Sequence, residues 1–100
     1  GSAGGPAIIS YVLKTLIGAL DWQLPMQDAI ALPNLVARGA SFGAEASRFD
    51  PELFARLHAL GFDLRAGEFE ESGLQGVRVR GDGTLEGGVD PRREGVALGY

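Results

Sequence analysis

The chain has no cysteine and few residues of several other reactive types. Its 100 residues include one histidine, one methionine and one tryptophan. Without cysteine, neither a disulfide framework nor a thiolate metal site can form. Basic residues are outnumbered as well: 9 Lys and Arg against 13 Asp and Glu leave a net charge of −4. Nucleic acids are bound by a basic face, so the negative charge leads us to expect no nucleic-acid partner. We also expect no metal and no other cofactor.

Long hydrophobic runs are also missing. The apolar stretch 7–20 is too short to span a membrane and contains Lys14. The sequence does not open with the charged region of a signal peptide. With 45% hydrophobic residues and a length of 100, the composition fits one small domain with its own core. We find no internal repeat, low-complexity tract or linker, and expect residues 1–100 to form a single domain.

The first helix is predicted from about Ala7 to Trp22. Pro6 suits a helix start, because the N–H that proline lacks would have no intrahelical partner there. Two apolar rows follow: Ile8, Val12, Leu16 and Leu20, and beside them Ile9, Leu13 and Ile17. Polar and small residues are confined to one stripe of Ser10, Lys14, Gly18 and Asp21. A helix that is apolar nearly all round is expected to be buried.

The later elements are mostly strands. Met26 to Leu32 predicts a short helix ended by Pro33, and Leu35 to Phe49 an irregular strand with a turn at Gly39 or Gly43. Asp50 is a candidate cap for a helix that ends at Gly61, with Leu53, Phe54, Leu57 and Leu60 on its inner face. Further strands are predicted at 62–66, 74–80, 85–89 and 96–99, with a hairpin turn at Asp82-Gly83. This order indicates an α+β fold with helices on one face of an antiparallel sheet.

The glycine-rich start, Gly1 to Pro6, could hold an anion or an oxyanion. The first N–H groups of a helix lack intrahelical partners and lie at the positive end of its dipole. Glycine lets such a backbone approach a ligand closely, because it has no Cβ. The plainer alternative is a loose chain end that binds nothing, and these six residues alone favour it.

Other candidate sites have plainer interpretations too. His58 has no nucleophile or orienting carboxylate in a recognisable pattern, so we expect a surface helix residue. Glu68, Glu70 and Glu71 lack a calcium ligand pattern and predict a solvated acidic turn. Trp22 is expected to be a packing residue at the helix end.

The residues near the second glycine pair also allow two interpretations. Asp90, Arg92 and Arg93 could bind an anionic substrate, but we expect Asp90 to cap a turn and to pair with one of the arginines. Gly87-Gly88 within a strand predicts a bulge or a close approach of two backbone segments.

Both ends of the sequence resemble the small subunit of gamma-glutamyltransferases. Gly1 to Pro6 followed by Ile8-Ile9-Ser10 is similar to the family's glycine-rich segment, and Leu85 to Tyr100 is similar to its C-terminal signature around Asp-Pro-Arg-Arg. Leu13 to Ile30 resembles its long helix. The segment Leu32 to Val36 departs from the sequence Ala-Pro-Arg-Phe-His that is common in the family. Ala3 stands where the family commonly has proline, and Ala7 where it commonly has arginine. These departures leave the substrate open.

The resemblance implies part of a four-layer αββα sandwich of the Ntn-hydrolase type, and an enzyme that transfers or hydrolyses gamma-glutamyl groups of glutathione-type substrates. The family's nucleophile is the N-terminal threonine of the small subunit. Thr15 and Thr84 are the only threonines here and neither fits that role, so we expect the isolated chain to be inactive. Gly4 and Gly5 carry over as backbone N–H donors of the oxyanion hole.

The resemblance also implies partners. The first helix should pack against the rest of a parent enzyme, which is its large subunit and the N-terminal part of its small subunit, or against a second copy of this chain. A periplasmic or extracellular location fits the family, and a cytoplasmic one stays open. Two alternatives remain: a non-catalytic interaction or structural domain, and a segment of a related Ntn-hydrolase acylase, such as a cephalosporin acylase, with another acyl group.

Overall fold

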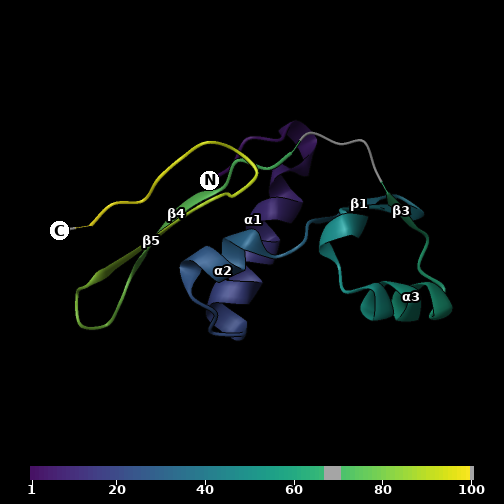
Figure 1. The fold of residues 1–100 in the computed structure, drawn as a ribbon, viewed down its shortest axis with the longest axis horizontal. Coiled ribbons are helices and arrows are strands. Elements are labelled where there is room, and N and C mark those ends of the chain that lie inside the picture. The colour runs from purple at the N-terminus through teal and green to yellow at the C-terminus, as the bar shows by residue number, and fades with distance from the viewer. Residues whose placement is uncertain (67–70, 100) are drawn as a thin grey trace.

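A computed structural model describes residues 1–66 and 71–99 of the chain. Figure 1 shows one group of elements around the first helix and a second group around α3. The helices are α1 (Ile8–Leu16), α2 (Met26–Ala31) and α3 (Pro51–Ala59). The strands are β1 (Leu35–Arg38), β2 (Ser41–Ala44), β3 (Leu64–Ala66), β4 (Gln75–Val79) and β5 (Leu85–Val89).

The first helix is confirmed and extends slightly further at its start than predicted. A 3₁₀ turn at Gly5–Ala7 leads into α1, and a π-helical turn at Ile17–Asp21 follows it. The N–H of Ala7 donates to the carbonyl of Gly4 over 3.1 Å. The chain therefore enters the helix directly from its glycine pair, as the Gly-Pro sequence predicted.

The burial of α1 differs from the prediction. Its polar stripe faces α2: Lys14 Nζ donates to the carbonyl of Ile30 over 2.7 Å, and a Cβ added to Gly18 would lie 3.1 Å from the Cβ of Ala29. The apolar rows face outward, with Ile9 78% and Leu13 56% exposed. Val12 packs against the core, but the described residues leave Ile9, Leu13, Leu16 and Leu20 largely uncovered, so α1 is not buried all round within this chain and only a further segment could complete its burial.

The strands form two small sheets instead of one antiparallel sheet. β1 and β2 pair antiparallel around the predicted turn at Gly39, while β3 pairs parallel to β2. β4 and β5 form a separate antiparallel hairpin around Asp82-Gly83, as predicted. The strand predicted at 96–99 is absent, because this segment has no neighbouring strand among the described residues and Leu98 is 86% exposed.

The outer helix α3 has the predicted ends but not the predicted packing. Asp50 Oδ1 accepts the N–H of Glu52 over 2.9 Å, and Gly61 has a φ of 95° at the other end. Its expected inner face is only partly covered: Phe54 packs edge-on against Phe49, while Leu53 and Leu60 are 46 and 74% exposed. His58 is on the surface, as predicted. Trp22 is 63% exposed, so its predicted packing role is wrong within this chain.

The buried core lies where α1, α2, β1 and the segment before β4 meet. Its members are Ala7, Tyr11, Ile30, Val36 and Leu74. Several contacts join α2 to β5: Gln27 exchanges hydrogen bonds of 2.8 and 3.0 Å with the backbone of Val89, the N–H of Met26 donates to Glu86 Oε1, and Gly88 lies against α2. A helix, α2, therefore packs on the antiparallel hairpin β4–β5, which is the α+β arrangement that the sequence predicted. The close approach of two backbone segments predicted at Gly87-Gly88 occurs at Gly88.

We expect Gly88→Ala to destabilise the protein. The added Cβ would lie 2.9 Å from Ile30 Cδ1 and 3.1 Å from the backbone nitrogen of Gln27, and overpacking of this kind costs about 1–3 kcal/mol. Gly81→Ala is the control, since nothing lies within 4 Å of a Cβ there. Denaturant unfolding of both variants measures the difference; equal midpoints would contradict the close packing of β5 on α2.

Candidate functional site

The glycine turn, Gly4-Gly5, consists of two consecutive residues with positive φ. Gly4 has a φ of 132° and is buried, and Gly5 has a φ of 53°. Side chains rarely tolerate either conformation. Among the described residues, none accepts a hydrogen bond from the N–H of Gly4 or of Gly5. The turn therefore places two N–H groups at the start of a helical segment, the arrangement that favours a negative charge.

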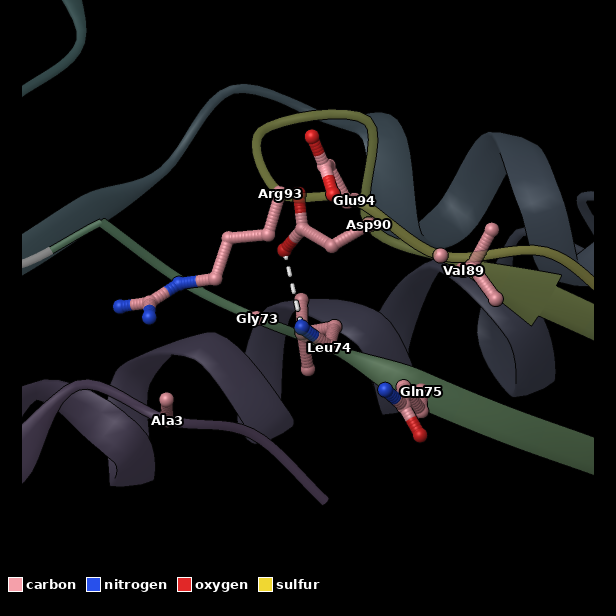
Figure 2. A pocket seen from close by; sticks show the side chains of 9 residues that line it. Ala3, Gly73, Leu74, Gln75, Val89, Asp90, Arg93 and Glu94 are labelled. Atoms are coloured by element: carbon pink, nitrogen blue, oxygen red, sulfur yellow. Dashed lines mark hydrogen bonds between the residues drawn. The ribbon is translucent and has the colours of Figure 1, made fainter.

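The segment before the glycine turn is held beside the start of β4. Gly1 and Gln75 pair like strand residues, with Gly1 N donating to Gln75 O over 3.0 Å and Gln75 N donating to Gly1 O over 2.9 Å. Ser2 Oγ accepts the N–H of Gly73 over 3.1 Å and donates to the carbonyl of Ala3 over 2.6 Å. Figure 2 shows Ala3 below Gly73 and Leu74, which lead into β4. The position of the turn thus depends on residues 73–75.

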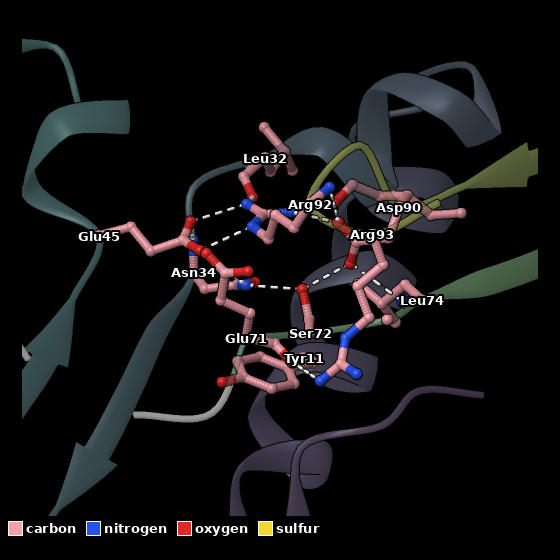
Figure 3. A network of polar contacts seen from close by, with 12 residues as sticks. Tyr11, Leu32, Asn34, Glu45, Glu71, Ser72, Leu74, Asp90, Arg92 and Arg93 are labelled. Atoms are coloured by element: carbon pink, nitrogen blue, oxygen red, sulfur yellow. Dashed lines mark hydrogen bonds and ion pairs between the residues drawn. The ribbon is translucent and has the colours of Figure 1, made fainter. Parts of the chain in front are cut away.

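Asp90 in turn holds residues 72–74. Its Oδ2 accepts the N–H of Leu74 over 3.0 Å and the hydroxyl of Ser72 over 2.5 Å, as Figure 3 shows. Its Oδ1 accepts the N–H of Arg92 over 3.0 Å. Burial raises the pKa of the Asp90 carboxyl, but hydrogen bonds from Ser72, Leu74 and Arg92 outweigh it and hold the pKa below its usual value. Asp90 is thus an ionised turn cap, as predicted.

Arg92 is the predicted ion-pair partner of Asp90. Its side chain is 0% exposed, and its Nη1 lies 3.0 Å from Asp90 Oδ1. It also binds Glu45 through two parallel contacts, Nε to Oε1 at 2.6 Å and Nη2 to Oε2 at 2.7 Å. Two carboxylates therefore neutralise and orient one buried guanidinium. Burial would lower the pKa of Arg92, but the hydrogen bonds to Glu45 and Asp90 raise it.

A second cation lies beside Arg92. Lys14 Nζ donates to the carbonyls of Ile30 and Leu32 over 2.7 and 3.0 Å, and Arg92 Nη2 donates to the same Leu32 carbonyl over 2.9 Å. Burial, and next the positive charge of Arg92, lower the pKa of Lys14 from 10.5 to about 8, although Asp90 and Glu45 counteract part of this. Lys14, which is the one lysine of the sequence, therefore loses its charge within an accessible pH range.

Asn34 completes the network between the two sheets. Its N–H and Nδ2 both donate to Glu45, over 2.9 and 3.3 Å, and Nδ2 also donates to Ser72 Oγ over 2.9 Å. Asn34 Oδ1 is buried and has no hydrogen-bond partner among the residues that the structure describes. Sequence reasoning missed Glu45, Ser72 and Asn34 as parts of the site. Their ordinary residue types in loops gave no signal, whereas the Asp-Pro-Arg-Arg run did.

The other candidate residues form local contacts of their own. Thr15 Oγ1 donates to the carbonyl of Tyr11 within α1, and Thr84 Oγ1 donates to Asp82 Oδ1 in the β4–β5 hairpin, so both hydroxyls have local roles. Arg93 Nη2 donates to the carbonyl of Glu71 over 2.7 Å. Glu71 is exposed, as an acidic turn requires, while Glu68 and Glu70 lie outside the described residues.

An open cavity of about 180 Å³ lies between the glycine-rich segment and the turn after β5. Ala3, Gly73, Asp90 and Arg93 are among the residues that line it, as Figure 2 shows. Within the described ranges, no cluster of three or more His, Cys, Asp or Glu side chains could hold a metal ion. Over the same ranges, every helix is too short or too polar to cross a bilayer.

The whole chain, residues 1–100, matches the model of the gamma-glutamyltranspeptidase family. The chain therefore belongs to this family of enzymes, as its two ends predicted. The oxamate amidohydrolase proenzyme of Klebsiella pneumoniae is 37% identical over 86 residues, which cover 77% of this chain and 16% of that protein. The glutathione hydrolase proenzyme of Bacillus subtilis is 24% identical over 100 residues, 99% of this chain and 17% of that protein.

Solved structures give the same fold. The gamma-glutamyltranspeptidase of Pseudomonas nitroreducens, solved in complex with L-DON, superimposes with a TM-score of 0.84 at 25% identity, over 100% of this chain and 53% of that one. The transpeptidase CapD of Bacillus anthracis shares the fold, with a TM-score of 0.78 at 20% identity over 99% and 61% of the two chains. The α+β fold is thus that of the family's Ntn hydrolases, and the chain spans about half the length of the solved structures it matches.

We expect Lys14 to titrate near pH 8. Its folded pKa lies below the ordinary 10.5, so between these two values the unfolded chain binds the proton and the folded chain does not. The stability contributed by this group therefore rises with pH across that window. Because Lys14 is the sole lysine, a lysine-selective ¹³Cε NMR titration reports on it directly, and Lys14→Gln should lack the signal. A midpoint near 10.5 would contradict the buried position of its ammonium group.

Proposed function

We propose that the chain is part of a gamma-glutamyltransferase-type Ntn hydrolase and supplies the backbone N–H donors of its oxyanion hole through Gly4 and Gly5. The observation that carries this proposal is the glycine turn itself. Its two residues adopt conformations suited to glycine, and no described residue accepts their N–H groups. Donors held in place before the reaction stabilise the negative charge that develops in a transition state.

The chemistry would be acyl transfer. An N-terminal threonine from another part of the parent protein attacks the gamma-amide carbonyl through its hydroxyl, and the amino group of that threonine accepts the hydroxyl proton. The carbonyl oxygen becomes an oxyanion that Gly4 and Gly5 bind. When the C–N bond breaks, the proton goes to the leaving amine and a gamma-glutamyl ester remains on the threonine. Water then releases glutamate, or an acceptor amine takes the gamma-glutamyl group.

A second candidate is hydrolysis of a small amide other than a gamma-glutamyl one. The observation in its favour is that the oxamate amidohydrolase proenzyme is 37% identical to this chain, against 24% for the glutathione hydrolase proenzyme. The same oxyanion donors would serve, because both reactions pass through a tetrahedral intermediate at an amide carbonyl.

Two assays on the complete protein that carries this chain separate the candidates. One follows release of the chromophore from a gamma-glutamyl anilide, with and without an acceptor dipeptide. The other follows ammonia released from oxamate. Turnover of the anilide alone supports the first candidate and turnover of oxamate alone the second, while a folded, processed protein without either activity overturns both.

Replacing Gly5 tests the oxyanion hole. We expect Gly5→Val to misplace a donor and to lower kcat by roughly a hundredfold or more, the usual loss for one oxyanion-hole donor, with a smaller effect on KM. Gly39→Val is the matched control, because Gly39 also has a positive φ, 64°, but nothing lies within 4 Å of a Cβ there. A Gly5→Val protein that is correctly processed and retains normal kcat would rule out this role.

We further propose that the apolar face of α1 packs against the remainder of the same parent protein. Ile9, Leu13 and Leu20 are 78, 56 and 61% exposed, and a contiguous apolar surface of this kind usually marks an interface. This chain covers 53% of the Pseudomonas nitroreducens structure. The part of such a protein that this chain does not cover is the natural source of the segment that packs on α1.

The exposed face of α1 predicts the behaviour of the isolated chain. Purified residues 1–100 should bind a hydrophobic dye and self-associate in light scattering, because the described residues leave Ile9, Leu13 and Leu20 largely exposed. The double variant Leu13→Gln, Leu20→Gln should reduce both signals, whereas Leu98→Gln, at another exposed position, should change them little. A compact monomer that binds no dye would contradict the proposal.

A further inference from the structure

The glycine turn rests on the ring of Tyr11. A Cβ added to Gly4 would lie 2.5 Å from Cε2, 3.1 Å from Cδ2 and 3.6 Å from Cζ of Tyr11. The ring therefore fills the space beside the Cα of Gly4. Gly4 is confined from two directions, since its carbonyl also accepts the N–H of Ala7 over 3.1 Å.

The Tyr11 ring is itself firmly placed. Tyr11 is 0% exposed and belongs to the buried core together with Ala7, Ile30, Val36 and Leu74. It lies one helical turn after Ala7, so it shares a helix face with the residue that binds the Gly4 carbonyl. The ring thus connects the core of the chain to the glycine turn.

A pair of glycines needs such a neighbour. Glycine loses more conformational freedom on folding than other residues, and its φ can change sign at little cost. Two N–H groups can stabilise an oxyanion only while they point at one place. A flat, rigid, buried ring restricts the backbone beside it more than a flexible side chain would.

We propose that Tyr11 is a positioning residue for the oxyanion donors: its ring holds Gly4, and thereby fixes the direction of the Gly4 and Gly5 N–H groups. The proposal rests on the proposed function of the glycine turn. It adds a side chain to a site so far made of backbone, and that side chain touches neither substrate nor nucleophile.

The test compares four variants of the complete, processed protein. We expect Tyr11→Leu to lower kcat by roughly ten- to a hundredfold, the size of effect that a slight misplacement of catalytic groups produces, with little change in KM. Tyr11→Phe keeps every ring atom that contacts Gly4 and should restore kcat to near the parent value. Val36→Ala removes part of the same core away from Gly4 and is the control for lost stability. Tyr11→Met, which fills the volume with a flexible chain, replaces Tyr11→Leu if that protein does not fold, with the same expectation.

A double-variant cycle provides a readout that lost stability would not move. If Tyr11 acts through the donors, Tyr11→Leu should slow a Gly5→Val protein much less than it slows the parent. A normal kcat in both Tyr11→Leu and Tyr11→Met, full additivity with Gly5→Val, or an equal loss of kcat in Val36→Ala would overturn the role of Tyr11 while the oxyanion proposal stands. A normal kcat in Gly5→Val would instead overturn the oxyanion proposal, and the role of Tyr11 with it.

Discussion

The ion pairs of Arg92 are the constraint on which the rest of the structure depends. One guanidinium, 0% exposed, joins Glu45 after β2, Asp90 after β5 and the Leu32 carbonyl after α2. β5 and α2 also pack directly at Gly88, whereas Glu45 is joined to them through its hydrogen bonds to Arg92 and Asn34. Removing one partner of a buried pair leaves an uncompensated charge, which typically costs about 3–5 kcal/mol. The position of the sheets around α1 thus depends on this buried ion-pair network as well as on the apolar core.

The same arrangement explains why an arginine and a lysine can lie side by side. The planar guanidinium of Arg92 keeps its charge and uses a carboxylate on each side. Within the described ranges, Lys14 Nζ donates to two carbonyls and forms no ion pair, and burial, followed by the positive charge of Arg92, lowers the pKa of its ammonium group. The two cations therefore have different roles: Arg92 carries a permanent charge, and Lys14 one that it can lose.

Local patterns in the sequence predicted local structure well. The Gly5-Pro6 helix start, the Asp50 cap and the Asp82-Gly83 hairpin all have causes within a few residues, and each is confirmed. The parallel pairing of β3 with β2 and the Glu45–Arg92 contact link distant segments, and no local pattern specifies them. The expected inner face of α3 is only partly covered for the same reason, because apolar rows indicate that something covers a helix but not which segment does so. For α1 the sequence indicated a covering segment without specifying it.

The pairing of Gly1 with Gln75 has a consequence for the order of assembly. A chain is synthesised from its N-terminus, so the glycine turn emerges long before the residues that hold it in place. Ser72, Leu74 and Asp90 are needed to fix the strand beside Gly1, and at about 5–20 residues per second they follow several seconds later. Contacts across such separations also close slowly. The two N–H groups of the turn therefore acquire their final direction late, when most of this segment has already been made.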